Sequence, residues 1–290
     1  LGFEEVAAAT SAKEMLRQGF DAELEKTVNW LAERERSVGS PALDEILNVN
    51  LFFSYFFGGG KTLDTEEFVL VTSRSSRYYV SAAYWDRDSL LWSFPAILLA
   101  DPETAEEMLH YVFTRQIRNV GIHSRFIDGT LLEPGFELDE LCAPAIALLR
   151  YVEYTGNTAF LQKDYIRDGL HCILKRLQSR RHPDVALYET FLQPTDDLRV
   201  YPYLTYDNVL VWYTLRKLAR YYPEYAGLEA EADRIMAAIH EHCVKEKKEK
   251  KMFAWSVDLK GNWDIYDEPP GSLLLLPHYG FCSQDDETWR

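Results

Sequence analysis

Two adjacent carboxylates, Asp196 and Asp197, stand out in a loop opened by Gln193-Pro194-Thr195 and followed by a long apolar helix pattern. Adjacent carboxylates repel each other, so one of them keeps its proton more readily when the pair is enclosed. Cleavage of a glycosidic bond needs a proton-donating acid of this kind. The pair alone is more typical of a turn with two hydrated acids, so its interpretation depends on the other motifs of the chain.

A second motif, Trp85-Asp86-Arg87-Asp88-Ser89, lies at the start of an expected helix. Arg87 and Asp88 offer a donor fork and an acceptor to neighbouring sugar hydroxyls, and Trp85 offers a flat face for stacking. The alternative is that Asp86 or Asp88 only caps the helix. In isolation the motif favours capping, but its residue types also fit a site that binds a sugar.

A third motif, Phe136 to Pro144, contains three acids within four residues. Asp139 is a suitable helix cap and Glu140 falls in the first turn, where the helix dipole favours a negative charge. One or two of these acids remain available to point into a cleft. Tyr206 follows the Asp196-Asp197 pair closely and is a candidate for the wall of the same pocket.

The composition excludes several other functions. The chain has 290 residues, 14% of them aromatic, and a formal net charge of −15. Nucleic-acid binding requires clustered Lys and Arg, so a nucleic-acid partner is not expected. The basic run from Lys245 to Lys251 is interrupted by glutamates and is interpreted as a solvated helix end and loop. An aromatic-lined cleft for sugars is more consistent with this composition.

No cofactor or metal is expected. The seven histidines form no metal-binding pattern, the four cysteines include no CxxC pair, and a GxSxG nucleophile elbow is absent. The acids at 285–287 lack the second acidic cluster that a magnesium-diphosphate site needs. No two of the four cysteines are close in sequence, which argues against a dense disulfide framework and favours reduced thiols in a cytoplasmic protein. No apolar run of about 18 residues is present, so no membrane partner is expected.

Hydrophobic periodicity predicts a mainly helical chain. Ser11 and Glu14 resemble the capping box of a first helix. We further expect short β-like runs at 68–71 and 78–80, and a hairpin or irregular loop at 252–263. Helices are expected over 11–34, 41–57, 88–100, 103–119, 138–155, 158–179, 206–221, 226–245 and from Ser272 onward.

The connections between these helices are alternately short and long. The long ones, 120–137 and 180–205, hold most of the unusual polar and aromatic residues. This asymmetry is typical of stacked helical hairpins with one functional face built from long loops.

The order of the motifs resembles glycoside hydrolase family 125, the metal-independent exo-α-1,6-mannosidases. The resemblance covers about residues 84–290 and includes a fourth segment, Pro270 to Phe281. The chain departs from the family pattern in three places. Thr195 replaces a serine, Glu140 replaces a serine, and Glu268-Pro269-Pro270-Gly271 replaces an asparagine-valine before a proline-serine pair.

The resemblance implies an all-α fold, the (α/α)6 toroid of six-hairpin glycosidases. Residues 1–60 would form an N-terminal helical segment, a linker plus the first barrel helix. Residues 61–290 would form the catalytic barrel, whose C-terminal part we expect to lie beyond this sequence.

The resemblance also implies an inverting mechanism on an oligosaccharide. Asp197, slightly favoured over Asp196, would be the general acid, and the general base is expected beyond Arg290. Arg87 and Asp88 would hold the non-reducing sugar, with Trp85 and Asp139 nearby. Glu140 and Tyr206 complete the candidate substrate contacts. Alternatives are an α-glucosidase, a debranching-type hydrolase or a glycoside phosphorylase of the same clan, and a non-catalytic carbohydrate-binding domain.

Overall fold

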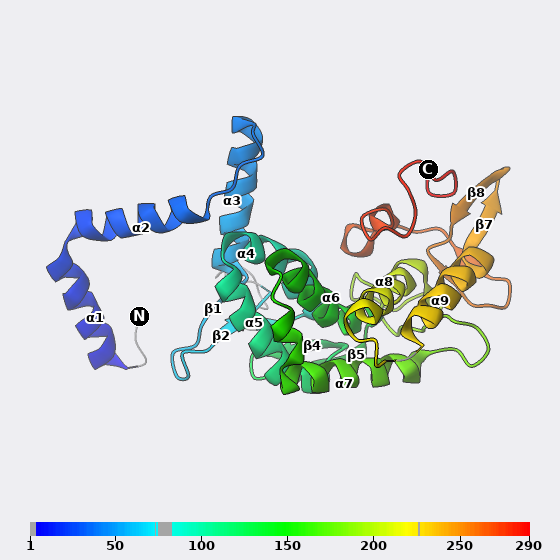
Figure 1. Ribbon diagram of the computed structural model, residues 1–290, viewed down its shortest axis with the longest axis horizontal. Coiled ribbons are helices and arrows are strands. Elements are labelled where there is room, and N and C mark those ends of the chain that lie inside the picture. Colours follow the sequence, from blue (N-terminus) through cyan, green and yellow to red (C-terminus); the bar gives the residue numbers. More distant parts are fainter. Residues whose placement is uncertain (1–3, 73, 75–82, 226) are drawn as a thin grey trace.

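The computed structural model describes residues 4–72, 74, 83–225 and 227–290, and these residues form a chain of packed helical hairpins (Figure 1). Its α-helices are α1 (Glu5–Gln18), α2 (Phe20–Arg34), α3 (Pro41–Phe57), α4 (Phe94–Ala100), α5 (Pro102–Thr114), α6 (Leu138–Thr155), α7 (Asp164–Arg180), α8 (Thr205–Tyr221) and α9 (Leu228–His242). A π-helical segment, η1 (Arg87–Ser93), leads directly into α4. Short 3₁₀ turns are η2 (Gln116–Asn119), η3 (Thr158–Gln162), η4 (Pro269–Gly271) and η5 (Leu273–Leu275).

Burial separates inner helices from outer ones. In α6 all residues from Leu138 to Leu149 are buried, and in α8 most residues are buried, including polar ones such as Asn208. By contrast α7 and α9 bury only one apolar stripe each, as amphipathic helices on the outside of a domain do. Packing of α6 against η1 and α8 makes these three the inner elements, and their N-terminal ends carry the predicted site motifs.

Small antiparallel sheets cover the end where the inner helices begin. β3 (Ala83–Tyr84) pairs with β4 (Ile122–Phe126), which pairs with β5 (Leu131–Phe136), and β5 runs directly into α6. β6 (Tyr203–Leu204) pairs with β9 (Ser256–Val257), which pairs with β10 (Trp263–Asp264), and β6 runs directly into α8. The strands therefore fix the start of two inner helices. The other strands are β1 (Gly59–Lys61), β2 (Phe68–Leu70), β7 (Val244–Lys247) and β8 (Lys250–Phe253).

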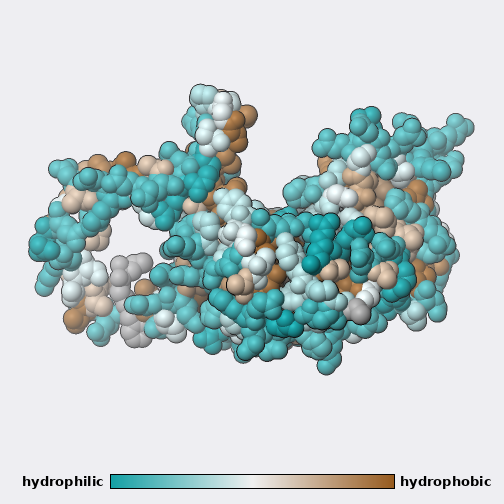
Figure 2. Space-filling model, viewed as in Figure 1, coloured by the Kyte–Doolittle hydropathy of each residue, from teal (hydrophilic) through white to brown (hydrophobic). Residues whose placement is uncertain are grey.

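The N-terminal helices differ from the rest because α1 and α2 contain no buried residue. They extend away from the body of the molecule, and α3 links them to α4 (Figure 1). One side of α3 carries an exposed apolar stripe that Figure 2 shows in brown, including Ile46, Val49 and Phe53. Local helix propensity, rather than burial in a core, shapes this part of the chain.

Several sequence-based boundaries were wrong. Ser11 caps nothing, because α1 begins at Glu5, and the expected first helix is broken at Gly19, whose φ of 87° no ordinary helical residue adopts. The basic run from Lys245 to Lys251 is the β7–β8 hairpin and not a helix end. Instead of a helix, the segment after Ser272 forms a single 3₁₀ turn.

Other expectations were closer. The strand at 68–71 is β2, and the segment 252–263 does contain hairpin strands. The β-like run at 78–80 lies outside the described residues. No helix in the described ranges is both long enough and apolar enough to cross a lipid bilayer.

Candidate functional site

Arg87 lies at the centre of the candidate site. The first turn of η1 places it among the N-terminal ends of the inner helices, and only 1% of its surface is exposed. Its Nε donates to Asp139 Oδ2 at 2.6 Å, and its Nη1 donates to Asp196 Oδ1 at 2.8 Å. One guanidinium therefore joins three predicted motifs that lie more than 50 residues apart in the sequence.

Two glutamates complete the acids around this arginine. Arg87 Nη2 donates to Glu137 and lies 3.7 Å from Glu140 Oε1. We call Arg87 with Glu137, Asp139, Glu140 and Asp196 the Arg87 cluster. Because a buried charge is costly without partners, the guanidinium and the carboxylates stabilise one another here. The donors of Arg87 are engaged with protein carboxylates, so in this state the residue orients acids and does not present a free fork to a sugar.

A second buried arginine supports the cluster from behind. Arg125 on β4 pairs with Asp86, and Tyr84 Oη donates to the same carboxylate at 2.6 Å. The backbone N–H of Asp86 donates to Glu140. Glu140 is thus attached to the η1 segment through its side chain and does not point to solvent. Glu140, which the sequence suggested as a substrate contact, is therefore buried and connects α6 to the η1 segment.

The proposed capping roles do not occur. The residue before α6 is Glu137, which makes no side-chain cap, and the Asp139 carboxylate is taken by Arg87. At η1, Asp86 likewise makes no side-chain cap. Long-range ion pairs have replaced the local hydrogen bonds that the sequence favoured at both helix starts.

His123 on β4 adds a titratable group to the cluster. Its Nδ1 lies 2.7 Å from Glu137 Oε1, and its Nε2 lies 3.2 Å from Glu133 Oε2. Burial lowers the pKa of His123, but the neighbouring carboxylates, Glu137 foremost, outweigh that effect, so the pKa is raised. The indole of Trp85 packs edge-on against this imidazole at 5.5 Å. Trp85 therefore lies beside the Arg87 cluster, with its ring largely buried.

His123, Glu137 and Asp196 each offer a ligand atom within 4.8 Å of the others, which is a possible metal-binding geometry. The sequence did not suggest this group, because the three residues come from separate segments. Both carboxylates already accept hydrogen bonds from Arg87. A cation placed between them would lie next to the guanidinium charge, so the donor set does not fit a metal while Arg87 stays there.

The Asp196-Asp197 loop lies at the open side of the cluster. Asp196 has a left-handed φ of 67°, and 48% of its side chain is exposed although it contacts Arg87. Asp197 is exposed as well, and its backbone carbonyl accepts from the N–H of Gln193. The two carboxylates therefore diverge, one held toward Arg87 and the other free in solvent. The pair is therefore not enclosed as a unit.

The remaining predicted contacts flank this loop. Burial, opposed by Arg87, raises the pKa of Asp88 to about 6, and the nearby charge of Asp196 adds to the rise. Tyr206 is buried at the start of α8 and meets the ring of Tyr279 at 6.3 Å. Tyr206 is thus part of the packed wall behind the loop.

Sequence reasoning missed several buried polar residues near the site. Asp207 is fully buried, and neither of its carboxylate oxygens has a hydrogen-bond partner among the described residues. Glu268 is 5% exposed. Burial raises the pKa of Asp207 well above its usual value, and Asp139 contributes further.

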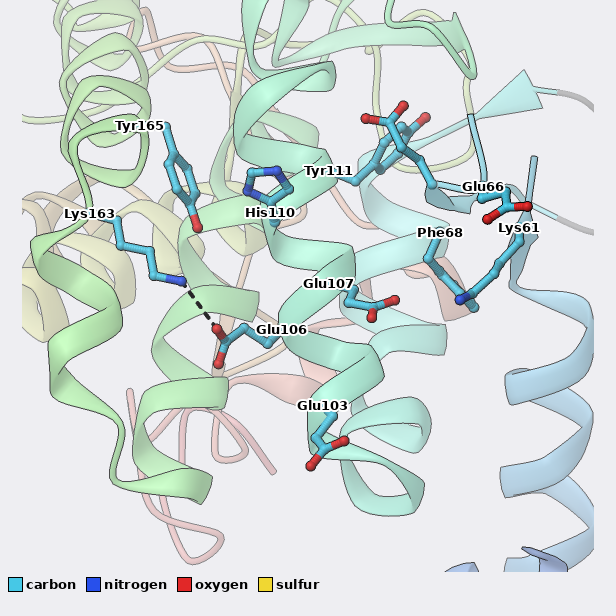
Figure 3. Close-up of a pocket in the computed structure, with 11 residues that line it drawn as sticks. Lys61, Glu66, Phe68, Glu103, Glu106, Glu107, His110, Tyr111, Lys163 and Tyr165 are labelled. Carbon is cyan, nitrogen blue, oxygen red and sulfur yellow. Dashed lines mark hydrogen bonds and ion pairs between the residues drawn. The ribbon is translucent and has the colours of Figure 1, made fainter. Parts of the chain in front are cut away.

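An unrelated cavity of about 550 Å³ lies on the outer surface between α5, the start of α7 and the β1–β2 hairpin (Figure 3). We call it the outer groove. Five glutamates line it, and Glu106 pairs with Lys163 at 3.2 Å across it. The outer groove contains none of the predicted site residues. Its full lining is Lys61, Glu66, Glu67, Phe68, Glu103, Glu106, Glu107, His110, Tyr111, Lys163 and Tyr165.

Comparison with known proteins agrees with this geometry. Residues 178–290 match the family described as metal-independent alpha-mannosidase (GH125). No curated protein matches the chain. Among solved structures, a Streptococcus pneumoniae metal-independent alpha-mannosidase in a non-productive complex with alpha-1,6-mannobiose superposes with a TM-score of 0.74 at 19% identity. This match covers 91% of the present chain and 74% of that chain.

More distant neighbours share the same architecture. A possible member of the GH105 family from Salmonella enterica has a TM-score of 0.56 at 16% identity over 83% of this chain and 66% of that one. An unsaturated glucuronyl hydrolase from a Bacillus species has a TM-score of 0.50 at 13% identity over 80% and 65%. The predicted all-α fold of helical hairpins is therefore confirmed, as is the predicted resemblance to family 125 over the matched residues.

Proposed function

From the premise that this chain is a glycoside hydrolase related to the GH125 alpha-mannosidases, we propose that it releases terminal mannose from α-linked oligosaccharides with inversion at the anomeric carbon. The observation that carries the proposal is the Arg87 cluster, in which one buried guanidinium gathers Asp139 and Asp196 from two different motifs. Such convergence of distant polar residues in an otherwise apolar fold is typical of a catalytic site.

The acid pair divides into two roles in this proposal. Asp197, which is exposed and makes no ion pair among the described residues, is the general acid that protonates the departing oxygen. Asp196 is bound to Arg87 and therefore stays an acceptor, suited to a sugar hydroxyl. Asp88 lies at the same opening and contributes a second acceptor. Trp85 supplies an apolar wall against His123.

Arg87 acts in this proposal by holding acids in place. It is bound to Glu137, Asp139 and Asp196, and a fixed set of acceptors orients the ring of a bound sugar without side-chain rearrangement. Glu140 and Tyr206 support the same arrangement from the inner helices.

A panel of disaccharides tests the substrate. We expect the full-length protein to release β-mannose from α-1,6-mannobiose, detected by NMR within seconds of mixing, before the anomers equilibrate. Release of α-mannose would refute inversion. Glucose from maltose, isomaltose or trehalose would instead assign the chain to an α-glucosidase or debranching activity. No release with or without phosphate would leave a carbohydrate-binding role.

Replacement of each acid tests the assignment. Asp197→Asn should lower kcat by about 10²- to 10⁴-fold, since that is the usual contribution of a general acid. Asp196→Asn should raise KM more than it lowers kcat, because its proposed role is binding. Asp286→Asn serves as the control, since the Asp286 carboxylate accepts from the N–H groups of Thr288 and Trp289 and so shapes a C-terminal turn. Full activity in both acid variants would refute the site.

The cellular location and the partner of the enzyme are proposed on separate grounds. All four cysteines are free, which is typical of a reducing compartment, so we place the protein in the cytoplasm. The net charge of −15 supports a neutral glycan, and not a nucleic acid, as its partner. We assign catalysis to residues 61–290 and a linking role to the exposed helices before them.

A further inference from the structure

His123 is a buried imidazole to which the proposed mechanism assigns no role. It lies on β4 with 7% of its surface exposed, and the Trp85 indole packs edge-on against its ring at 5.5 Å. Its Nδ1 lies 2.7 Å from Glu137 Oε1, and its Nε2 lies 3.2 Å from Glu133 Oε2. Each ring nitrogen therefore meets a carboxylate, in a setting where packing restricts rotation of the ring.

The hairpin that carries His123 packs directly against the base of the Asp196-Asp197 loop. The N–H of Leu192, just before this loop, donates to the Phe136 carbonyl at the end of β5 at 3.0 Å. A Cβ atom added to Gly135 on β5 would lie 2.8 Å from Leu192 Cδ1 and 3.3 Å from His123 Cβ, so no side chain fits between them. The histidine and the base of the loop are therefore held close together by the backbone.

The side chain of Asp196 is oriented by contacts at one of its two oxygens. Arg87 Nη1 donates to Oδ1 at 2.8 Å, and His123 Nδ1 lies 3.7 Å from the same Oδ1. Asp196 has a left-handed φ of 67°, which few residues other than glycine adopt, and 48% of its side chain is exposed. The contacts at Oδ1 leave Oδ2 as the oxygen that can accept from a sugar hydroxyl.

The charges around His123 favour its protonated form. Glu137 faces it from the start of α6, Glu133 from β5 and Asp196 from the loop. Arg87 of η1 is a neighbouring cation, but it binds the other oxygen of Glu137. Burial lowers the pKa of His123, and the hydrogen bond to Glu137 with the three negative charges outweighs that effect. A protonated ring attracts the Asp196 carboxylate across 3.7 Å, whereas a neutral ring carries no charge to do so.

We propose that His123 is a positioning residue that binds Glu137 through Nδ1 and, together with Arg87, holds Asp196 in the orientation in which it accepts a sugar hydroxyl. The inference rests on the proposed glycosidase function and deepens it, because it concerns how the same site binds its sugar. His123 acts through the two carboxylates and does not touch the reacting atoms.

Two substitutions in the full-length protein separate the two ring nitrogens. His123→Asn places an amide with two N–H donors close to the position of Nδ1, so KM should stay within about 3-fold of the wild type. His123→Gln places its donors close to Nε2 instead and should raise KM by about 10-fold with kcat little changed, because a hydrogen bond to a charged group contributes on that order. Turnover of the disaccharide that the wild type cleaves gives both constants. Equal KM values in the two variants, or a loss of kcat with KM unchanged, would overturn the proposal.

A double-mutant cycle with Asp196→Asn tests whether the histidine acts through that residue. If it does, His123→Gln should raise KM by less than about 3-fold when Asp196 is already asparagine, because residues that act together do not contribute independently. A merely structural role of His123 would instead give the same rise in KM in both backgrounds. Effects that multiply in the double variant would therefore contradict the proposal.

A second histidine provides the matched control. His240 on α9 stacks on the Phe281 ring at 5.4 Å and pairs with no carboxylate among the described residues. His240→Gln should leave KM and kcat unchanged, and a rise in KM equal to that of His123→Gln would sink the proposal. A wild type that cleaves no disaccharide would refute the glycosidase function itself. The Kd of mannose, measured by calorimetry for the wild type and His123→Gln, would then decide the role of His123, and equal values or no binding would overturn it.

Discussion

The Arg87 cluster and the outer groove are both rich in carboxylates, yet they differ in almost every physical property. Around Arg87 the acids Glu137, Asp139 and Glu140 are fully buried and share one guanidinium. In the outer groove the acids are partly or fully exposed, and Glu106 meets Lys163 in solvent. The same side-chain chemistry therefore has different consequences, because burial removes the water that would otherwise solvate each charge.

The protonation behaviour of the two regions follows this difference. Burial raises the pKa of Glu137 and raises that of Glu140 well above its usual value, in spite of Arg87. At Glu106 the effect of burial is smaller than that of its contacts with Tyr151 and Lys163, so the pKa is lowered. Perturbed groups of the first kind mark functional sites, and solvated pairs of the second kind usually do not.

The largest effect is expected from Arg87→Met. Removal of the guanidinium leaves Asp139 and Glu137 buried without their partner, which should lower the free energy of unfolding by about 3–5 kcal/mol and abolish turnover. Urea unfolding followed by circular dichroism measures the first effect. The matched control is Arg115→Met, whose partner Glu67 is 41% exposed and whose loss should change stability by less than about 1 kcal/mol. Equal losses in the two variants would show that burial does not distinguish these ion pairs.

A smaller effect, which depends on pH, is expected from Asp88→Asn. The folded-state pKa of Asp88 is about 6 against a usual 3.8, so the folded protein holds this proton to higher pH than the unfolded chain does. Stability from this group is therefore fully present below pH 3.8 and is lost as the pH rises through about 6. Each pKa unit corresponds to about 1.4 kcal/mol, so the loss by pH 7 amounts to at most about 3 kcal/mol.

The measurement compares unfolding of the wild type and Asp88→Asn at pH 4.5 and pH 7. Asparagine carries no titrating proton, so the variant should gain stability relative to the wild type at the higher pH. The control is Asp233→Asn, in an exposed pair with Arg216, which should show no gain of this kind. A difference between wild type and Asp88→Asn that stays constant with pH would contradict the raised pKa.

The smallest effect is expected in the outer groove. Glu106→Gln weakens the contacts with Lys163 and Tyr151, yet it should change the unfolding free energy by less than about 1 kcal/mol and leave mannobiose turnover unchanged. Thermal unfolding and the disaccharide assay check both statements. A loss of activity in Glu106→Gln would remove the contrast between the groove and the Arg87 cluster.

Much of the fold was predictable because the inner and outer helices carry strong apolar periodicity. The ranges expected for α3, α6 and α8 agree with the structure within one residue at each end. The prediction was wrong where the structure did not follow a local sequence pattern. Ser11 looked like a cap although the helix had already begun, and Lys245 to Lys251 looked like a helix end although Val244 and Phe253 close a hairpin there.

Several residues of the candidate site could be selected from the sequence, but the contacts between them could not be predicted. Arg87, Asp139 and Asp196 were selected from separate motifs, and the structure brings them onto one guanidinium. His123 and Arg125 were missed, because a lone histidine and a lone arginine in a loop carry no periodic or spacing signal. Their importance arises only from their contacts with Glu137 and Asp86.

The sequence by itself determined the helical hairpins, the long loops on one face and the three motifs with their acids, since periodicity, turn residues and residue type are local properties. Only the tertiary structure decided which charges pair, that Asp196 contacts Arg87 while Asp197 is exposed, and that Asp207 is buried with no hydrogen-bond partner among the described residues. Pairing and desolvation depend on groups from separate segments of the chain, and the free energy of a charge is set by those neighbours and not by its own place in the chain.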